Sequence, residues 1–450
     1  MAYTFTGTSS ADTFVAGDPT GGTATGLGAA DQLTGNTGND TLYGNAGADT
    51  LDGGASGKDV IFGGSDNDNI IAGSGANLLY GNAGADTITA GDGNNTIVGG
   101  DDSTDGGDAI TFGNGKDLVF GNGGADTIQG GTGASTVVGG AGDDFIGLTG
   151  PATGGDFIYG NKGNDTISVG AGNNTITGGA DDDFIITGTG NDLIYGNLGA
   201  DTIFASNGNN SIFGGDDSTD GADYITAGTG NDLITGNGGN DTIFGGGGRD
   251  TLVGGAGNDT VVAGDGKNWL FGNQGDDLID GSAAGAANAE TITGGQGNDT
   301  ILGGAGNDAL YGNLGNDSIS TNGGADTVLG GEGADTVSFD PTNTTADAPD
   351  YWQDLVFGTD KLDVNGTIFA AGNVATVAGG DVTAAASNAM AAVAGASGAT
   401  GTDQVAATFA FGGQSYLVVQ QDANQTYDAG TDILVNVTGS TGTVTKTDFV

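Results

Sequence analysis

"GNTGNDTLYGNAGADTLD", residues 35–52, consists of two consecutive nonapeptides that follow one pattern. Each has Gly at its first and fourth positions, Asp at its sixth, Thr at its seventh and Leu at its eighth. The same period continues from about residue 26 to residue 338, for example in "GGAGNDTVV" (254–262) and "GGQGNDTIL" (294–302). Such a short period over so long a stretch predicts a repeat architecture, in which each unit stacks on its neighbours.

Each position of the nonapeptide has a physical reason. Glycine at the first, second and fourth positions lets the backbone adopt the positive φ angles of a tight turn. Aspartate at the sixth position places a carboxylate at the exit of the turn, and Ca²⁺ takes about six to eight oxygen ligands. The eighth position is large and apolar in every unit. Each unit therefore predicts one short strand with a single inward side chain, and the seventh and ninth positions face outward.

The repeat follows the pattern G-G-x-G-x-D-x-U-x, where U is a large apolar residue, and about three quarters of the chain resembles the RTX family of calcium-binding repeat proteins. This resemblance implies an all-β fold: a right-handed parallel β-roll, or β-helix, with two strands in each coil and a thin aliphatic core. It also implies that several Ca²⁺ ions lie between the stacked turns. Their expected ligands are the aspartates at the sixth position.

Successive turns of such a roll alternate between its two edges, so the sixth positions divide into two sets. One set, the continuous edge, has Asp in all sixteen turns: Asp49, Asp68, Asp86, Asp108, Asp126, Asp144, Asp165, Asp183, Asp201, Asp223, Asp241, Asp259, Asp277, Asp299, Asp317 and Asp335. The other set, the interrupted edge, has nine: Asp40, Asp59, Asp117, Asp156, Asp192, Asp232, Asp250, Asp308 and Asp326. Its seven exceptions are Asn77, Asn95, Ser135, Asn174, Asn210, Asn268 and Glu290.

The exceptions on the interrupted edge lead to a prediction about calcium. A site that needs carboxylates from two neighbouring turns lacks one of them in the middle of this edge. We therefore predict dense calcium along the continuous edge and sparse calcium, or none, in the middle of the interrupted edge. Two explanations of the Asn residues stay open, because an Asn carbonyl oxygen can still bind a cation and stacked Asn side chains can hydrogen-bond from coil to coil without an ion.

The composition excludes several classes of function. The chain has 450 residues, with 57 acidic and 7 basic ones, and a formal net charge of −50. This charge excludes nucleic acid and anionic membrane surfaces as natural partners. Without Cys there is no disulfide or thiolate metal site, and without His the commonest general base is missing. No stretch predicts membrane insertion, and residues 1–10 do not look like a cleavable signal peptide.

A stripe of aromatic residues recurs at the ninth position on one of the two predicted sheets. This aromatic stripe consists of Tyr43, Phe62, Tyr80, Phe120, Tyr159, Tyr195, Phe213, Phe271 and Tyr311. The ninth position of the other sheet is mostly small or polar. Large exposed apolar patches are uncommon on monomers, so the stripe predicts a contact surface between copies of the chain. In the alternative explanation, the rings pack against one another and stiffen the sheet.

The period stops at residue 338, and we expect three parts: an N-terminal cap with atypical repeats (1–34), the β-roll (35–338) and a C-terminal β-rich cap (339–450). "FGTDKLDV" (357–364) and residues 415–450 resemble the C-terminal region that follows such repeats in proteins exported by type I secretion. The resemblance implies an uncleaved export signal, type I secretion machinery as a partner, and a secreted protein at the cell surface. Alternating segments at 407–411, 415–421 and 431–439 predict strands, and residues 384–396 predict a short helix.

Proteins of this family combine the repeats with proteases, lipases, epimerases or pore-forming domains. Here the H-E-x-x-H motif is impossible without His, and no G-x-S-x-G motif occurs, so we expect no enzymatic activity. The sequence favours an extracellular, calcium-dependent, self-assembling structural protein, namely a bacterial surface-layer subunit. A secreted fibre or biofilm-matrix protein and a calcium-dependent adhesin are the alternatives. The acidic chain should stay unfolded in the calcium-poor cytoplasm and fold when it binds calcium outside.

Overall fold

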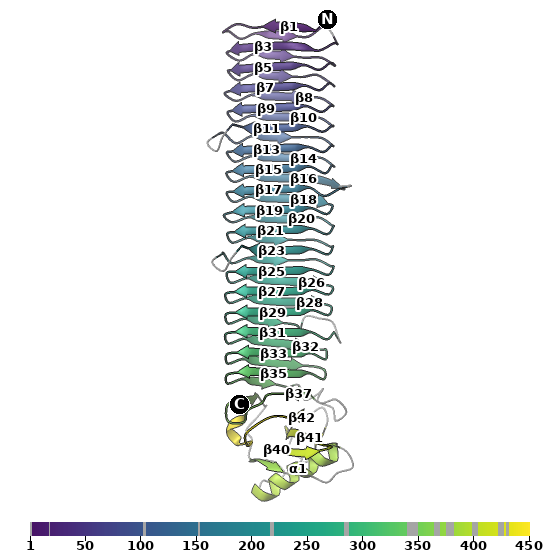
Figure 1. Ribbon diagram of the computed structural model, residues 1–450, viewed down its shortest axis with the longest axis vertical. Helices are drawn as coiled ribbons and strands as arrows, with labels where there is room; N and C mark the ends of the chain where they lie inside the picture. Colours follow the sequence, from purple (N-terminus) through teal and green to yellow (C-terminus); the bar gives the residue numbers. More distant parts are fainter. Residues whose placement is uncertain are drawn as a thin grey trace. The chain divides into compact units, whose positions relative to one another are not determined.

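The computed structural model describes residues 2–450 except residues 18, 102–104, 152–153, 217–219, 283–287, 340–349, 364–369, 375–381, 398–403, 422–426 and 429–431. The chain divides into two compact units. Unit 1 comprises residues 1–216 and 220–229, and unit 2 comprises residues 217–219 and 230–450. In both units each coil contributes one strand to each of two parallel sheets (Figure 1).

In unit 1 the odd-numbered strands pair in parallel from coil to coil and form the odd sheet. These strands are β1 (Tyr3–Thr6), β3 (Gly22–Gly28), β5 (Thr41–Ala46), β7 (Val60–Ser65), β9 (Leu78–Ala83), β11 (Thr96–Gly100), β13 (Leu118–Gly123), β15 (Thr136–Ala141), β17 (Phe157–Lys162), β19 (Thr175–Ala180), β21 (Leu193–Leu198) and β23 (Ser211–Gly215). The even-numbered strands form the even sheet: β2 (Thr13–Val15), β4 (Gln32–Thr34), β6 (Thr50–Asp52), β8 (Asn69–Ala72), β10 (Thr87–Ala90), β12 (Ala109–Thr111), β14 (Thr127–Gly130), β16 (Phe145–Pro151), β18 (Thr166–Ala171), β20 (Phe184–Thr187), β22 (Thr202–Phe204) and β24 (Tyr224–Thr226).

Unit 2 repeats this arrangement with an odd and an even sheet of its own. Its odd sheet contains β25 (Leu233–Gly238), β27 (Thr251–Ala256), β29 (Trp269–Gln274), β31 (Thr291–Gln296), β33 (Ala309–Leu314), β35 (Thr327–Glu332) and β37 (Asp350–Trp352). Its even sheet contains β26 (Thr242–Gly247), β28 (Thr260–Asp265), β30 (Leu278–Asp280), β32 (Thr300–Gly304), β34 (Ser318–Asn322), β36 (Thr336–Ser338) and β38 (Lys361–Asp363).

The eighth position of every repeat forms the core of the coils. The register places Leu42 opposite Ile61, and Ile61 opposite Leu79, so these side chains stack from coil to coil. All three are fully buried. Each repeat contributes one such aliphatic residue at its eighth position, because neighbouring residues of a strand point to opposite faces. The predicted parallel β-roll with a thin aliphatic core is therefore confirmed.

The second position of the turns on the continuous edge alternates between two backbone conformations. In every other coil it is Asn with φ between 76° and 84°, at Asn45, Asn82, Asn122, Asn161, Asn197, Asn237, Asn273 and Asn313. In six of the intervening coils it is Gly with φ between 107° and 140°, at Gly64, Gly140, Gly179, Gly255, Gly295 and Gly331. A Cβ atom at each of these glycines would overlap the backbone carbonyl of the Asn one coil earlier. The structural repeat of this edge is therefore two coils.

Both sheets of unit 2 continue past residue 338. Strand β37 pairs with β35, and β38 pairs with β36, in the parallel arrangement of the preceding coils. Strand β42 (Ile433–Asn436) then pairs with β37, so the last segments of the chain extend the odd sheet.

In the described residues after the last coil there is a small sheet and one α-helix. Strand β40 (Val405–Phe411) pairs in parallel with β39 (Ala370–Val374) and antiparallel with β41 (Gln414–Val419), which is antiparallel to β42. Helix α1 (Val382–Ser397) packs its alanine-rich face on β40, and a 3₁₀ turn, η1 (Lys446–Asp448), lies near the end of the chain. The strands and the helix expected in this region are present. No helix in the described ranges is long and apolar enough to cross a membrane.

Candidate metal centre

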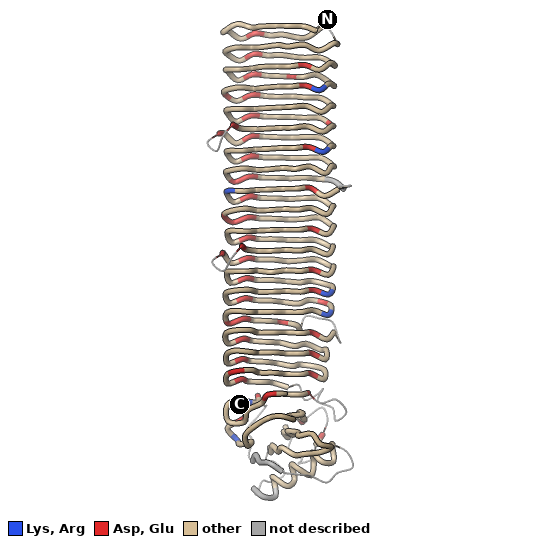
Figure 2. The backbone as a smooth tube through the Cα atoms, in the orientation of Figure 1, with Lys and Arg blue, Asp and Glu red and all other residues tan. Residues whose placement is uncertain are grey.

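The sixth-position side chains lie inside the turns at both edges of the coils. On the continuous edge all sixteen Asp residues are only 1–3% exposed, and on the interrupted edge the sixteen sixth-position residues are 0–5% exposed. The continuous edge is the one at which the odd strands end, on the left in Figure 2. Burying so many carboxylates is unfavourable unless each is paired, hydrogen-bonded or bound to a cation.

One oxygen of most of these carboxylates accepts a hydrogen bond from a backbone N–H of the preceding coil. The backbone N–H of Asp165 donates to Oδ1 of Asp183 at 2.8 Å, and the N–H of Asp183 donates to Oδ1 of Asp201 at 2.8 Å. Equivalent bonds run along the continuous edge of unit 1 from Asp12 onward, and along that of unit 2 as far as Asp360. These charge-assisted hydrogen bonds make each continuous edge a ladder that ties every coil to the next.

The second oxygen, Oδ2, is buried without a hydrogen-bond donor at most of these residues. Among the described residues of the continuous edge this holds for Asp49, Asp68, Asp86, Asp108, Asp126, Asp144, Asp165, Asp183, Asp201, Asp259, Asp277, Asp299, Asp317 and Asp335. At Gly196, a Cβ would overlap both Oδ2 of Asp201 and the carbonyl oxygen of Gly214 in the next coil. The absent side chain of the first-position glycine thus leaves space in which a carboxylate and a carbonyl oxygen converge.

The electrostatics of the ladder favour a bound cation. Burial raises the pKa of Asp183 to about 8; the N–H of Asp165 opposes this shift, and the charges of Asp201 and Asp165 add to it. Burial likewise raises the pKa of Asp108 to about 8. A divalent cation would satisfy the Oδ2 atoms and remove the repulsion between neighbouring coils. Buried, all-oxygen surroundings are the donor set that Ca²⁺ prefers, and these residues fit it.

The ligand set of such a cation would include the backbone. Within the described ranges no group of three acidic side chains meets at one point. A calcium ion at a turn would therefore combine one or two carboxylates with carbonyl oxygens of the glycine-rich loops, which lie close to the carboxylates at Gly196 and its equivalents. When bound, calcium would supply the charge that holds the carboxylates of adjacent coils together.

The Asn side chains of the interrupted edge close their turns with hydrogen bonds. Nδ2 of Asn174 donates to the carbonyl oxygens of Gly170 at 3.3 Å and Gly172 at 3.2 Å, and to Oδ1 of Asp192 in the next coil at 3.0 Å. The bonds to two carbonyls of the same turn recur at Asn77, Asn95 and Asn210. The amide thus places a donor among oxygens, where an Asp would place another acceptor. Of the two explanations left open by the sequence, the coil-to-coil hydrogen bond is present at Asn77, Asn95 and Asn174.

The first position of the turn also distinguishes the two edges, which the sequence interpretation missed. It is Gly throughout the continuous edge, but on the interrupted edge it is often a buried apolar residue, as at Ala72, Ala90, Phe112, Val169 and Ala205. These side chains fill part of the core. At the equivalent position of the continuous edge, glycine leaves space beside the carboxylate. The replacement of Gly at first positions of the interrupted edge is visible in the sequence and could have predicted this difference between the edges.

The two edges differ in charge as well. Four of the seven basic residues, Lys58, Lys116, Arg249 and Lys267, stand immediately before the sixth position on the interrupted edge. In Figure 2 most basic residues of the coils (blue) lie on the edge opposite to the one along which acidic residues (red) recur in nearly every coil of each unit. Each coil-bearing unit therefore has one strongly acidic edge and one with mixed charge.

The structure adds members to the ladders that the sequence prediction did not include as ligands. Asp31 joins the continuous edge one coil before Asp49. On the interrupted edge the backbone N–H of Asp326, the last Asp predicted there, donates to Asp350. On the continuous edge the N–H of Asp335 donates to Asp360 in the same way. Asp31 lies 18 residues before its partner Asp49, as in the regular repeat. Asp350 and Asp360 lie 24 and 25 residues after their partners, so the sequence period does not identify them.

Where members of the aromatic stripe lie in neighbouring coils, their rings pack against one another. In unit 1, the ring centroids of Tyr43 and Phe62 are 5.2 Å apart with an interplanar angle of 2°, and those of Phe62 and Tyr80 are 5.0 Å apart. This stacking agrees with rings that stiffen the sheet, and contact between copies stays a prediction. Larger exposure occurs at the seventh position, where Phe157 is 50% and Trp269 is 52% exposed, and the sequence interpretation did not single out these residues.

Replacing Asn174 with Asp should convert a turn closed by hydrogen bonds into one that needs a cation. Asn174→Asp would place an acceptor against three oxygens, which costs about 1–3 kcal/mol or more without calcium. We expect it to raise the calcium content of the folded chain and to raise the calcium concentration needed for folding. The matched control, Asp183→Asn on the continuous edge, should lower the calcium content. Equilibrium dialysis with metal analysis measures both, and equal calcium content in the two variants would contradict the assignment.

The model of the RTX calcium-binding nonapeptide repeat (4 copies) matches the chain at residues 25–56, 54–79, 71–105, 120–147, 152–185, 186–219, 217–252, 253–283, 285–319 and 307–337. The matches together cover more than half of the chain. They include the turns of both edges in unit 1 and unit 2 whose buried carboxylates are described above. Among curated proteins no match is found.

Proposed function

The chain belongs to the family of proteins with RTX calcium-binding nonapeptide repeats, and we propose that it is a secreted structural protein that assembles with copies of itself as a bacterial surface-layer subunit. Proteins with these repeats are typically secreted. The resemblance of residues 415–450 to type I export regions supports the same route for this chain. In this proposal the chain crosses the cell envelope unfolded and folds outside.

The observation that carries the proposal is the extent of the carboxylate ladders. They run from coil to coil through unit 1 and through unit 2, so the repeats are held together by the same groups that would bind calcium. Calcium that binds the folded chain and not the unfolded one shifts the folding equilibrium by mass action. A chain that consists mostly of such coils is suited to form a rigid building element at calcium concentrations found outside the cell.

The differences between the two edges, and between the two sheets, support an ordered assembly. One edge is strongly acidic and the other carries four basic residues, and the odd sheet carries the aromatic stripe. Such differences fix the orientation in which neighbouring copies can pack, because like charges are kept apart and opposite charges can meet. Contacts in which one surface of a copy meets a different surface of the next allow open-ended assembly.

Electron microscopy of the purified chain tests the proposal. In about 1–5 mM calcium we expect ordered two-dimensional sheets that disappear when calcium is chelated. Tyr195→Ser in the aromatic stripe should weaken the sheets, while Phe204→Ser, at the ninth position of the even sheet, serves as the matched control. Fibres instead of sheets would favour the fibre alternative. A chain that folds with calcium but remains monomeric at all concentrations would contradict self-assembly.

A further inference from the structure

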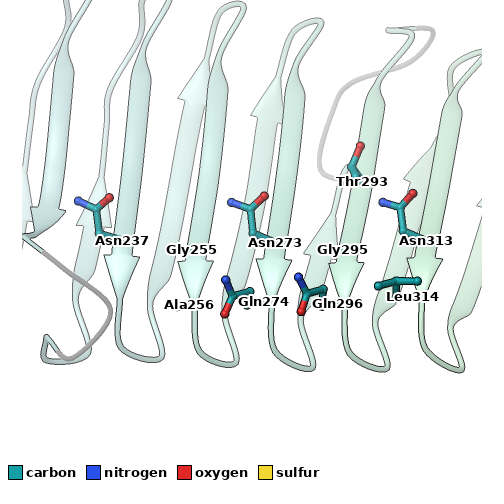
Figure 3. Close-up of a pocket in the computed structure, with 10 residues that line it drawn as sticks. All are labelled: Asn237, Gly255, Ala256, Asn273, Gln274, Thr293, Gly295, Gln296, Asn313 and Leu314. Atoms are coloured by element: carbon teal, nitrogen blue, oxygen red, sulfur yellow. The ribbon is translucent and has the colours of Figure 1, made fainter.

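A groove of about 570 Å³ lies on the outer face of the odd sheet of unit 2, where strands β25 to β33 end (Figure 3). Its ten described lining residues include no charged one, although the chain has a net charge of −50. The polar side chains that line it are the amides of Asn237, Asn273, Asn313, Gln274 and Gln296 and the hydroxyl of Thr293. A groove of this size is in the range of small-ligand sites, and its polar groups are neutral donors and acceptors.

The spacing of the amides is imposed by the backbone. Asn273 and Asn313 lie two coils apart, and the register places Gly295 between them. A Cβ at Gly295 would overlap the carbonyl of Asn273, so no side chain can fill the gap. Figure 3 shows the two Asn amides projecting in the same direction on either side of this gap. Two coils correspond to about 9.5 Å, because neighbouring strands lie about 4.7–4.9 Å apart.

The amides of Asn273 and Asn313 are not used within the fold. In the described part of the chain, no side-chain hydrogen bond engages the amide of Asn273 or Asn313. In unit 1 the equivalent Asn122 donates from Nδ2 to the carbonyl of Gly100 at 2.6 Å. Asn273 and Asn313 therefore present their donors and acceptors outward.

A gap in the aromatic stripe lies beside the same amides. Phe271 and Tyr311 occupy the ninth position of β29 and β33, and Thr293 lies between them in register. Where the stripe is continuous, neighbouring rings are 5.0–5.2 Å apart. Phe271 and Tyr311 are separated by two coils, about 9.5 Å, which is too far for direct ring contact but leaves room for one further ring between them. The floor of that space is a threonine.

We propose that this groove binds a neutral hexopyranose unit of a polysaccharide. The sugar ring occupies the space above Thr293, with its C–H groups toward Phe271 and Tyr311. Its hydroxyl groups exchange hydrogen bonds with the amides of Asn273 and Asn313, since an amide both donates and accepts. An apolar aromatic ligand would bury these amides without partners. An anionic sugar would meet an acidic chain with no cation in the groove. This site goes beyond the proposed function and does not depend on self-assembly.

The chain contains a natural reporter for this site. Trp269 lies two residues before Phe271 on the outer face of β29 and is 52% exposed, whereas the only other tryptophan, Trp352, is fully buried. Titration of the calcium-loaded full chain with hexasaccharides of β-1,4-, α-1,4- or β-1,3-linked glucose should give a saturable change in tryptophan fluorescence for at least one of them. We expect a Kd on the order of 1 mM, the affinity typical of a single sugar ring.

Two variants locate the binding. Thr293→Phe fills the gap in the stripe and should raise the Kd at least tenfold while the fold is kept. Asn313→Gly removes one amide but tolerates the positive φ of 79°, and should raise the Kd severalfold. The matched control is Val98→Phe, which fills a ninth position of the odd sheet in unit 1 and should leave the Kd unchanged.

Three results would overturn the proposal. The first is the absence of a saturable signal with all three sugars, and the second is an equal Kd for Thr293→Phe and Val98→Phe. The third is a fluorescence change that follows protein concentration without sugar and is lost in Thr293→Phe, which would make the groove an interface between copies of the chain. Sedimentation of the same samples measures assembly independently, so failure of sugar binding and failure of the proposed function are distinguishable.

Discussion

Removal of calcium at pH 8 should unfold the coils of both units and disperse any assembly. At this pH the buried carboxylates would carry charges with no counter-charge, and an uncompensated buried charge costs about 3–5 kcal/mol. The total stability of a folded domain is only about 5–15 kcal/mol, so a few such residues in adjacent coils are sufficient. Far-UV circular dichroism before and after chelation measures the effect, and we expect loss of most of the β signal.

The controls for chelation distinguish the effect of calcium on folding from the effect of ionic strength. Adding calcium back should restore the spectrum, whereas magnesium at the same concentration should not, because it requires a smaller and more regular octahedral site. Sodium chloride at matched ionic strength should have no effect on the chelated chain beyond modest screening. A chelated chain that retains its full β signal at pH 8 would show that the ladders are stable without a cation.

Acidification of the calcium-free chain should have the opposite effect and restore β-structure. Burial, with added repulsion from adjacent coils, raises the pKa of Asp49 to about 6, of Asp201 to about 7 and of Asp108 to about 8. These values lie above the ordinary 3.8, so the folded chain binds protons that the unfolded chain releases. The resulting stability is complete below about pH 4 and is lost as the pH rises through 6 to 8.

The pH dependence should reverse when calcium is present. Calcium binds deprotonated carboxylates, so the loaded fold should be favoured toward pH 8 and should release calcium as the pH falls toward 5. Circular dichroism between pH 5 and pH 8, in chelator and in calcium, would give two curves of opposite slope. Identical spectra of the calcium-free chain at pH 5 and pH 8 would refute the role of the buried carboxylates.

The parts of the fold that follow the nine-residue period could be predicted from the sequence. The inward position of Ile203 follows from its place in the repeat, and counting turns assigns Asp201 and Asn210 to different edges. The hydrogen bonds of the Asn amide could be named only as one of two alternatives, because Asn offers both a carbonyl oxygen and a donor. The backbone around Asn210 brings two carbonyl oxygens of the same turn within 3.2 Å of Nδ2, and at Asn174 Nδ2 also reaches Oδ1 of Asp192 in the next coil.

Features outside the period could not be predicted in the same way. Asp350 and Asp360 continue the ladders, but the residues between them and the last repeats break the spacing that identifies a ligand. The groove of unit 2 depends on which residues meet across β29, β31 and β33, and Thr293 looks like an ordinary outward residue until the register places it between two aromatic positions. Stacking of the rings likewise depends on side-chain geometry that a residue pattern does not contain.

The alternation of Asn and Gly at the second position limits how such a chain can change length during evolution. Deleting the single coil that contains Gly255 would place Asn237 directly against Asn273, without the glycine whose missing Cβ leaves room for the carbonyl of Asn237. Deleting two coils, the 36 residues that separate Asn237 from Asn273, would restore the original neighbours. Gene duplications and deletions that survive selection should therefore add or remove coils in even numbers, and homologous chains should differ in length by whole pairs.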